Sequence, residues 1–190
     1  MTRWRALGGV VGPAAFIGAW SILGTTVDGY SPVDDPISRL AALGADTRPG
    51  MTAGLLVFAA GVTGLAAELR RSPAMGDAWI PALITAGGAV GIALTPLDSS
   101  LGGAAHGTAA GVSYASLALV PLLASRALRA TGRRRLAGAS LAAGLVCAGS
   151  LAASVLVDDR TGLWQRLGLT TGDVWLMASA VALTLRPNTD

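Results

Sequence analysis

Asp98 and His106 are the two side chains of this sequence that are best suited to acid–base chemistry. They lie close together in the segment Pro96-Leu-Asp-Ser-Ser-Leu-Gly-Gly-Ala-Ala-His106, and His106 is the only histidine. A carboxylate that fixes one imidazole tautomer prepares the other ring nitrogen to exchange a proton. Both residues are therefore candidate catalytic groups. The alternative is that His106 is a hydrogen-bonded structural residue and that Ser99 or Ser100 only caps the following helix.

A second carboxyl group stands in the segment Tyr30-Ser-Pro-Val-Asp-Asp-Pro-Ile-Ser-Arg-Leu40. Asp35 followed by Pro36 has the form of a helix N-cap and a first helical residue, which predicts a short interfacial helix. The apolar face of that helix would carry Ile37, Leu40 and Leu43. Either Asp35 only caps the helix, or it is a catalytic acid. The candidate substrate-binding residues beside it are Tyr30, Ser38 and Arg39.

The third polar segment reads Val157-Asp-Asp-Arg-Thr-Gly-Leu-Trp-Gln-Arg166. Asp159 is a further candidate catalytic acid, and Trp164 is an aromatic residue of the kind found at membrane interfaces. The candidate binding residues here are Trp164, Arg166 and Asp173, the last about one turn into the next apolar segment. The alternative is a surface ion-pair network, which would contribute little stability.

Together these residues favour chemistry that needs no metal. A carboxyl group whose pKa is raised by partial burial can protonate an alkene, an epoxide or an ester. One histidine and one cysteine cannot form a His/Cys zinc site, and no aspartate-rich diphosphate motif is present, so no metal and no cofactor are expected. Membrane terpene cyclases that use acids offer an analogy of mechanism for cyclisation, isomerisation or hydrolysis.

The elements that must position these side chains are membrane-spanning helices. Of the 190 residues, 52% are hydrophobic and only 13% are charged, and mean hydropathy is +0.58. Segments of about 20 apolar residues match the hydrocarbon thickness of a bilayer. We therefore expect an all-α, polytopic transmembrane bundle of six helices in one domain, residues 1–190, with spans at about 6–24, 50–69, 79–97, 104–125, 136–157 and 168–185.

The charged residues sort to opposite ends of these spans. Ten of the 14 arginines flank one end, and 8 of the 11 acidic residues flank the other. Because cytoplasmic loops carry the excess of basic residues, both termini are expected in the cytoplasm and the acids outside. The positive net charge of +3 therefore does not indicate a nucleic-acid partner. No charge is expected near the membrane midplane, which argues against a channel or a proton pump.

Glycine pairs four residues apart inside the spans predict close helix packing. These pairs are Gly50/Gly54, Gly87/Gly91 and Gly107/Gly111.

The Tyr30–Leu40 run, the Asp98 and His106 hairpin and the Gly162-Leu-Trp-Gln-Arg166 segment resemble the bacterial domain-of-unknown-function family numbered 998. The resemblance covers nearly the whole chain. A remoter similarity is to the six-helix DRAM/FRAG/SFK membrane proteins, some of which are linked to lipid remodelling. The resemblance implies a six-helix protein of the bacterial cytoplasmic membrane. It implies no particular activity.

Two classes of function remain open. The first is an acid–base enzyme that acts on an amphiphilic lipid or isoprenoid, which would need a closed apolar pocket beneath the acids. The second is a non-enzymatic protein whose polar cluster binds a membrane lipid or a partner protein.

Overall fold

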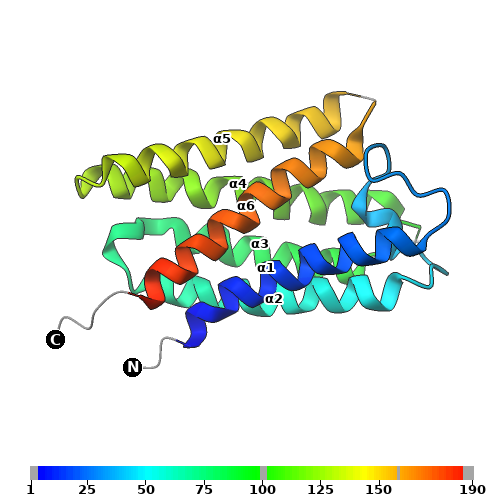
Figure 1. The fold of residues 1–190 in the computed structure, drawn as a ribbon, viewed down its shortest axis with the longest axis horizontal. Coiled ribbons are helices and arrows are strands. Elements are labelled where there is room, and N and C mark those ends of the chain that lie inside the picture. Colours follow the sequence, from blue (N-terminus) through cyan, green and yellow to red (C-terminus); the bar gives the residue numbers. More distant parts are fainter. Residues whose placement is uncertain (1–3, 99–101, 158, 186–190) are drawn as a thin grey trace.

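The computed structural model describes residues 4–98, 102–157 and 159–185, and these residues form helices and connecting loops without a strand. Six long helices follow one another along the chain (Figure 1). With η3 counted together with α3, all six are long and apolar enough to cross a membrane, which confirms the fold class. They are α1 (Trp4–Leu23), α2 (Arg48–Arg70), α3 (Trp79–Leu94), α4 (Gly102–Ala130), α5 (Arg134–Leu156) and α6 (Thr161–Thr184). Three short 3-10 helices join them: η1 (Gly24–Thr26), η2 (Ile37–Ala41) and η3 (Pro73–Ala78).

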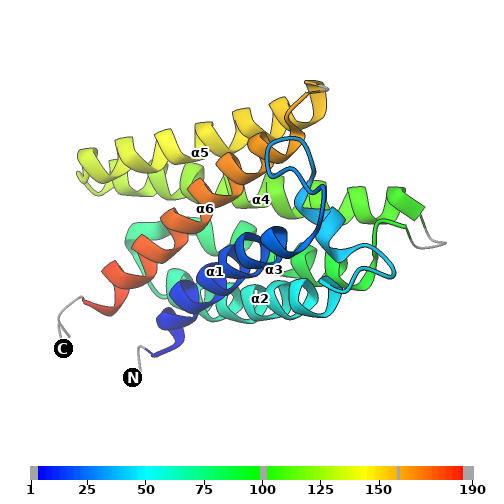
Figure 2. The ribbon, with the colours of Figure 1, turned by 45° about the vertical axis from the view of Figure 1, so that its right-hand side comes forward.

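The helices form a closed ring. Each long helix packs against the next along the chain, and α6 returns to pack against α1. In both ribbon views α6 crosses the bundle obliquely, with α5 on one side and α1 on the other (Figures 1 and 2). The sides that face inward are closely packed, and the fully buried side chains include Val62, Leu65, Leu117, Val120 and Leu176. Large apolar side chains on every long helix remain exposed, as expected for helices that face lipid.

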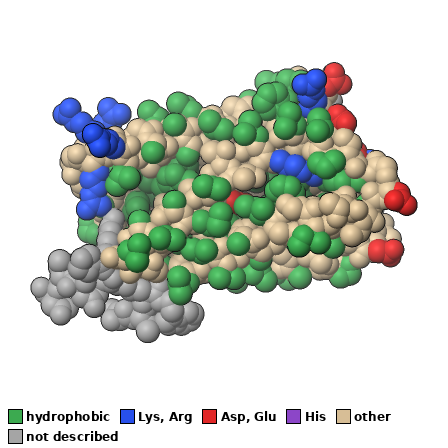
Figure 3. Space-filling view, viewed as in Figure 1, with side chains coloured by type: hydrophobic (Ala, Val, Ile, Leu, Met, Phe, Trp, Pro, Cys, Tyr) green, Lys and Arg blue, Asp and Glu red, His purple; other side chains and the backbone are tan. Residues whose placement is uncertain are grey.

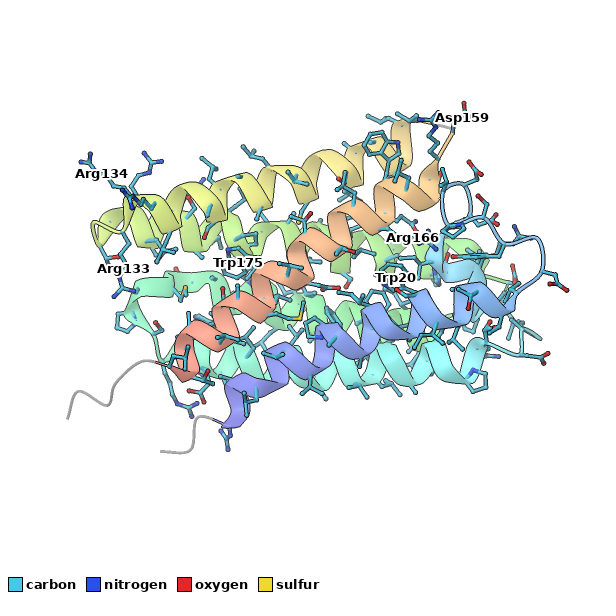
Figure 4. All side chains as sticks on the ribbon, viewed as in Figure 1. Trp20, Arg133, Arg134, Asp159, Arg166 and Trp175 are labelled. Carbon is cyan, nitrogen blue, oxygen red and sulfur yellow. The ribbon has the colours of Figure 1, made fainter. Side chains whose placement is uncertain are left out.

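The bundle has a basic end and an acidic end. Most blue side chains gather at one end of the space-filling view and most red side chains at the other, where some blue side chains also lie (Figure 3). Arg133 and Arg134 mark the basic end, whereas Asp159 and the loop that precedes α2 lie at the acidic end (Figure 4). The described chain also begins and ends at the basic end (Figure 1). The separation of basic from acidic side chains that the sequence predicts is thus present in the fold. Which end of the bundle faces the cytoplasm stays a prediction.

The short helix in the first loop is η2, a 3-10 helix that enters the bundle. Ile37 and Leu40 are buried in the hydrophobic core, whereas Leu43 lies beyond the helix and is 46% exposed. Asp35 does not cap this helix, because Pro36 occupies the N-cap position and the cap makes no side-chain hydrogen bond. The expected cap was wrong because the Asp35 carboxylate is held by other donors, described below.

Glycine brings α1 and α2 into close contact. A Cβ atom at Gly61 would overlap the Gly8 carbonyl oxygen and would lie 2.9 Å from the Gly12 Cα atom. Such backbone approach lets van der Waals packing hold apolar helices together in lipid. Three of the six glycines expected to pack lie close to another helix, because an added Cβ atom would lie 2.9 Å from Leu23 at Gly50, 2.8 Å from Ala19 at Gly54 and 3.1 Å from Ala109 at Gly91. The other three have open space at that position: Gly87, Gly107 and Gly111.

We predict that Gly61→Ala destabilises the bundle by about 1–3 kcal/mol, because the added methyl group forces α1 and α2 apart. Thermal unfolding of the detergent-solubilised protein measures the effect. Gly111→Ala is the matched control, since no atom of another element lies within 4 Å of a Cβ built there. We expect its midpoint to equal or slightly exceed that of the wild type, because alanine favours a helix over glycine by about 0.5–1 kcal/mol. Equal midpoints for both variants would contradict the packing role of Gly61.

Candidate functional site

Arg166 of α6 holds the first loop against the bundle. Its Nη1 donates hydrogen bonds to the carbonyl oxygens of Pro32 (2.6 Å), Asp35 (3.1 Å) and Gly162 (3.0 Å), and its Nη2 donates to the Tyr30 hydroxyl. Arginine suits this task because its donors point outward in a rigid plane. The contacts with the first loop join residues that lie more than 130 positions apart in the sequence.

The backbone of α6 adds to this contact. The N–H groups of Gly162 and Leu163, which have no partner within the first turn of a helix, donate to the carbonyl oxygens of Asp34 and Val33. Only glycine fits at position 162, because a Cβ atom there would lie 2.6 Å from the Pro32 carbonyl oxygen. The loop therefore caps α6 with its own backbone.

Two aromatic rings cover the Arg166 guanidinium group. Its central carbon lies 5.2 Å from the centre of the Trp20 ring and 5.5 Å from that of Tyr30. Figure 4 shows Arg166 and Trp20 facing each other between α6 and α1. Burial raises the pKa of the Tyr30 phenol, although the Arg166 charge opposes that shift. Tyr30 and Arg166, both expected as substrate-binding residues, thus bind each other.

Asp35 is an ionised, engaged carboxylate. It accepts a hydrogen bond from the Ser31 N–H (2.8 Å) and forms an ion pair with Arg39. The Ser31 hydrogen bond and, after it, the charges of Arg39 and Arg166 outweigh the effect of burial and hold the pKa of Asp35 below its ordinary value. This direction is opposite to the one that a proton-donating acid would need. Arg39 is itself 58% exposed.

His106 lies in the wall of a cavity at the acidic end of the bundle. The cavity has a volume of about 110 Å³ and lies between α1, α2, α3, α4, α6 and η2. Most of its wall is apolar, from residues such as Phe16, Met51, Leu55 and Phe58. The polar side chains that line it are Ser38, Thr85, His106, Ser113, Tyr114 and Gln165. The structure therefore brings together two of the expected site residues, Ser38 and His106.

The partner of His106 is a backbone group and not Asp98. His106 is buried, and its Nδ1 lies 2.7 Å from the Thr95 carbonyl oxygen at the end of α3. Asp98 is exposed and forms no hydrogen bond or ion pair with any residue that the structure describes. The hairpin thus places His106 as expected, but it turns the imidazole toward the backbone.

Asp159 and Trp164 lie outside the cavity. Asp159 is exposed on the connection between α5 and α6 and points away from the bundle (Figure 4). The Trp164 side chain is partly buried, and its carbonyl oxygen accepts a hydrogen bond from the Tyr114 hydroxyl. Asp158, Ser99 and Ser100 fall outside the described residues. In the part of the chain that is described, no three His, Cys, Asp or Glu residues are grouped as metal ligands.

Comparison with known families identifies the chain. The family model described as "Protein of unknown function (DUF998)" matches residues 10–182, which include most or all of each long helix and the whole site. The chain belongs to the DUF998 family. Comparison with curated proteins and with solved structures found no match.

The position of Asp173 in this DUF998 protein differs from the expected one. Because α6 begins at Thr161, Asp173 is the thirteenth of its 24 residues and lies near the middle of the helix. Its side chain is fully buried. The expectation of no charged residue type near the midplane was therefore wrong. The hydropathy pattern misplaced the start of α6 because Thr161, Gln165 and Arg166 are polar.

Several residues of the DUF998 site were missed from the sequence. Trp20 was detectable in principle, because a tryptophan near the end of an apolar span is typical of a membrane interface. Gln165, whose Oε1 accepts the Ile37 N–H at 3.0 Å, sits beside residues that were singled out. No feature of the sequence pointed to Tyr114, which lies within a span, or to Thr95, which acts through its backbone carbonyl.

We predict that Arg166→Lys loosens the first loop. A lysine ammonium keeps the charge, but its three donors on one atom cannot reproduce the planar set of contacts to Pro32, Asp35 and Tyr30. Hydrogen–deuterium exchange should become faster at the amides of residues 31–40. Arg160→Lys is the control, because Arg160 is an exposed arginine directly before α6. This variant should leave the exchange rates unchanged. We call the contacts of Arg166 with Tyr30, Pro32 and Asp35 the loop clamp. Exchange at wild-type rates in Arg166→Lys would rule out this clamp.

We also predict a pH-dependent effect of Asp35→Asn. Because the folded-state pKa of Asp35 is below the ordinary value of 3.8, the ionised carboxylate stabilises the fold above that pH, and this stabilisation is lost as pH falls through the folded-state pKa. The variant should be less stable than the wild type by about 1 kcal/mol at neutral pH. The difference in unfolding midpoint should shrink on acidification. Asp28→Asn, at an exposed position in the same loop, should show no such trend, and a pH-independent difference for Asp35→Asn would refute the assignment.

Proposed function

We propose that this DUF998 membrane protein is an enzyme that carries out acid–base chemistry on an amphiphilic lipid or isoprenoid, with His106 as the reacting group. One observation carries the proposal: His106 presents its imidazole in a mainly apolar cavity while its Nδ1 is bound by the Thr95 carbonyl. We place the site in the outer leaflet of the bacterial cytoplasmic membrane, since most acidic residues lie at that end of the bundle and most arginines at the other.

The hydrogen bond to Thr95 selects the tautomer of His106. A carbonyl oxygen only accepts hydrogen bonds, so a neutral imidazole must carry its proton on Nδ1. Nε2 is then the unprotonated nitrogen and has no hydrogen-bond partner among the described residues. A general base needs such a nitrogen, and after proton uptake the same group acts as a general acid. Thr95 thus takes the orienting role that the sequence suggested for Asp98.

The cavity favours the apolar part of a substrate. Its volume of about 110 Å³ admits a few carbon atoms, such as an isoprene unit or the end of an acyl chain. Ser38, Ser113 and Gln165 offer hydroxyl and amide groups for one or two oxygen atoms of the substrate. Removal of a proton from carbon, isomerisation, or hydrolysis of an ester with His106 as base fits this lining. Asp35 and Arg166 would act indirectly, by holding the loop that covers the cavity.

The alternative is a non-enzymatic lipid-binding protein. It is favoured by the composition of the cavity wall, because no carboxyl group stands among the lining residues to act as a second acid or base beside His106. The same cavity would then hold the end of a lipid chain without changing it.

Incubation of the purified protein with bacterial lipid extracts, followed by lipid mass spectrometry, distinguishes the two functions. We expect His106→Asn to lower the rate of product formation by about 100-fold or more, because the asparagine amide can still donate to Thr95 but provides no base. Thr108→Ala is the control, since Thr108 lies on the same helix, is exposed and does not line the cavity. A bound lipid that the wild type leaves unchanged, and that His106→Asn still binds, would favour the lipid-binding function and contradict catalysis.

A further inference from the structure

Asp173 is a carboxyl group without a partner in the middle of the bundle. Its side chain is 0% exposed, and within the described residues neither carboxylate oxygen has a hydrogen-bond partner. Ionisable groups at membrane depth are costly and mark functional sites more often than other buried residues do. Nothing in the loop clamp or in the chemistry proposed for His106 uses this side chain.

The neighbours of Asp173 do not offer it a positive charge. Tyr114 of α4 and Cys147 of α5 are the titratable groups that interact with it electrostatically, and neither is cationic. Both are engaged elsewhere: the Tyr114 hydroxyl donates to the Trp164 carbonyl, and the Cys147 thiol donates to the Gly168 carbonyl. Among the described residues of α1 and α2, the other helices that pack against α6, no charged group acts on Asp173.

An unpaired carboxylate at this position would cost several kcal/mol, because it would lose its hydration without gaining a counter-ion. A neutral carboxyl group costs far less to bury. We propose that Asp173 is a proton-binding site: its carboxyl group holds a proton in the folded protein and exchanges it with water that enters from the cavity. In the exchange, the carboxyl O–H proton passes to that water while the water returns one of its own protons to the other carboxyl oxygen, so that both the carboxyl group and the water stay neutral.

The geometry of α6 provides the route to the cavity. Gln165 and Leu169 line the cavity, and Asp173 follows Leu169 by four residues, which places it one turn deeper on nearly the same face of the helix. From α4, Tyr114 and Leu117 line the same cavity. The cavity that contains His106 therefore lies about one helical turn from Asp173 along α6, and it provides a route by which water can approach the carboxyl group.

Infrared spectroscopy of the reconstituted protein tests the proposal without any assay of turnover, so it remains informative if His106 is not catalytic. We expect a protonated-carboxyl C=O stretching band at neutral pH that is lost in Asp173→Asn and retained in Asp28→Asn, the exposed control. Loss of a carboxylate band in Asp173→Asn, with no change among protonated carboxyl groups, would overturn the proposal. It would indicate a bound cation or an ion pair in place of a proton.

A second measurement covers the case in which Asp173→Asn does not fold. The apolar reagent N,N′-dicyclohexylcarbodiimide reacts with protonated carboxyl groups in membranes, and peptide mass spectrometry of the labelled wild type locates the modified residue. We expect modification of Asp173 and none of the exposed Asp28. Wild-type protein without a protonated-carboxyl band and without label on Asp173 would also overturn the proposal.

Discussion

The contact between the Arg166 guanidinium group and the first loop is the interaction on which the acidic end of this protein depends. A loop that leaves a membrane helix carries many backbone carbonyl and N–H groups, and each must find a partner or water. Here one arginine donates hydrogen bonds to two carbonyl oxygens of the loop, while carbonyl oxygens of the loop accept hydrogen bonds from the first N–H groups of α6. This reciprocal arrangement fixes the loop without a carboxylate, among the residues that the structure describes, at hydrogen-bonding distance from Arg166.

The cavity exists because the loop is fixed. Ile37, Ser38 and Ala41 contribute to its wall, and all three belong to η2, whose first N–H is held by Gln165 of α6. Without these contacts we expect η2 to leave the cavity wall, so that the polar side chains around His106 become more accessible to water. An imidazole nitrogen in a mainly apolar cavity interacts more strongly with the charge that develops during proton transfer than one in bulk water does, since its surroundings screen that charge less. The clamp and the proposed chemistry are therefore linked through η2.

The sequence was sufficient for the architecture but only for parts of the site. Six spans and the sorting of charges follow from hydropathy and from the positions of the arginines, because both reflect the bilayer. His106 was recognised from its residue type, yet its partner Thr95 acts through a backbone carbonyl that residue types do not reveal. Asp98 and Asp159 carry the right chemistry for a site, but the fold leaves both exposed. The depth of Asp173 was missed because the polar residues at the start of α6 did not look like part of a span. They bind the first loop and belong to the helix, so the helix begins earlier than hydropathy indicates.

The long sequence separation within the clamp has a consequence for biogenesis. Pro32 and Arg166 are 134 residues apart. During translation the loop therefore emerges before its partner Arg166, and four further helices, α2 to α5, are inserted before α6 is made. Until α6 arrives, the ring of helices is open between α1 and α5, and the carbonyl groups of the loop must be hydrated at the membrane surface. Closure of the ring and completion of the cavity are thus a single late assembly step, and a chain that stops before α6 cannot form the site at all.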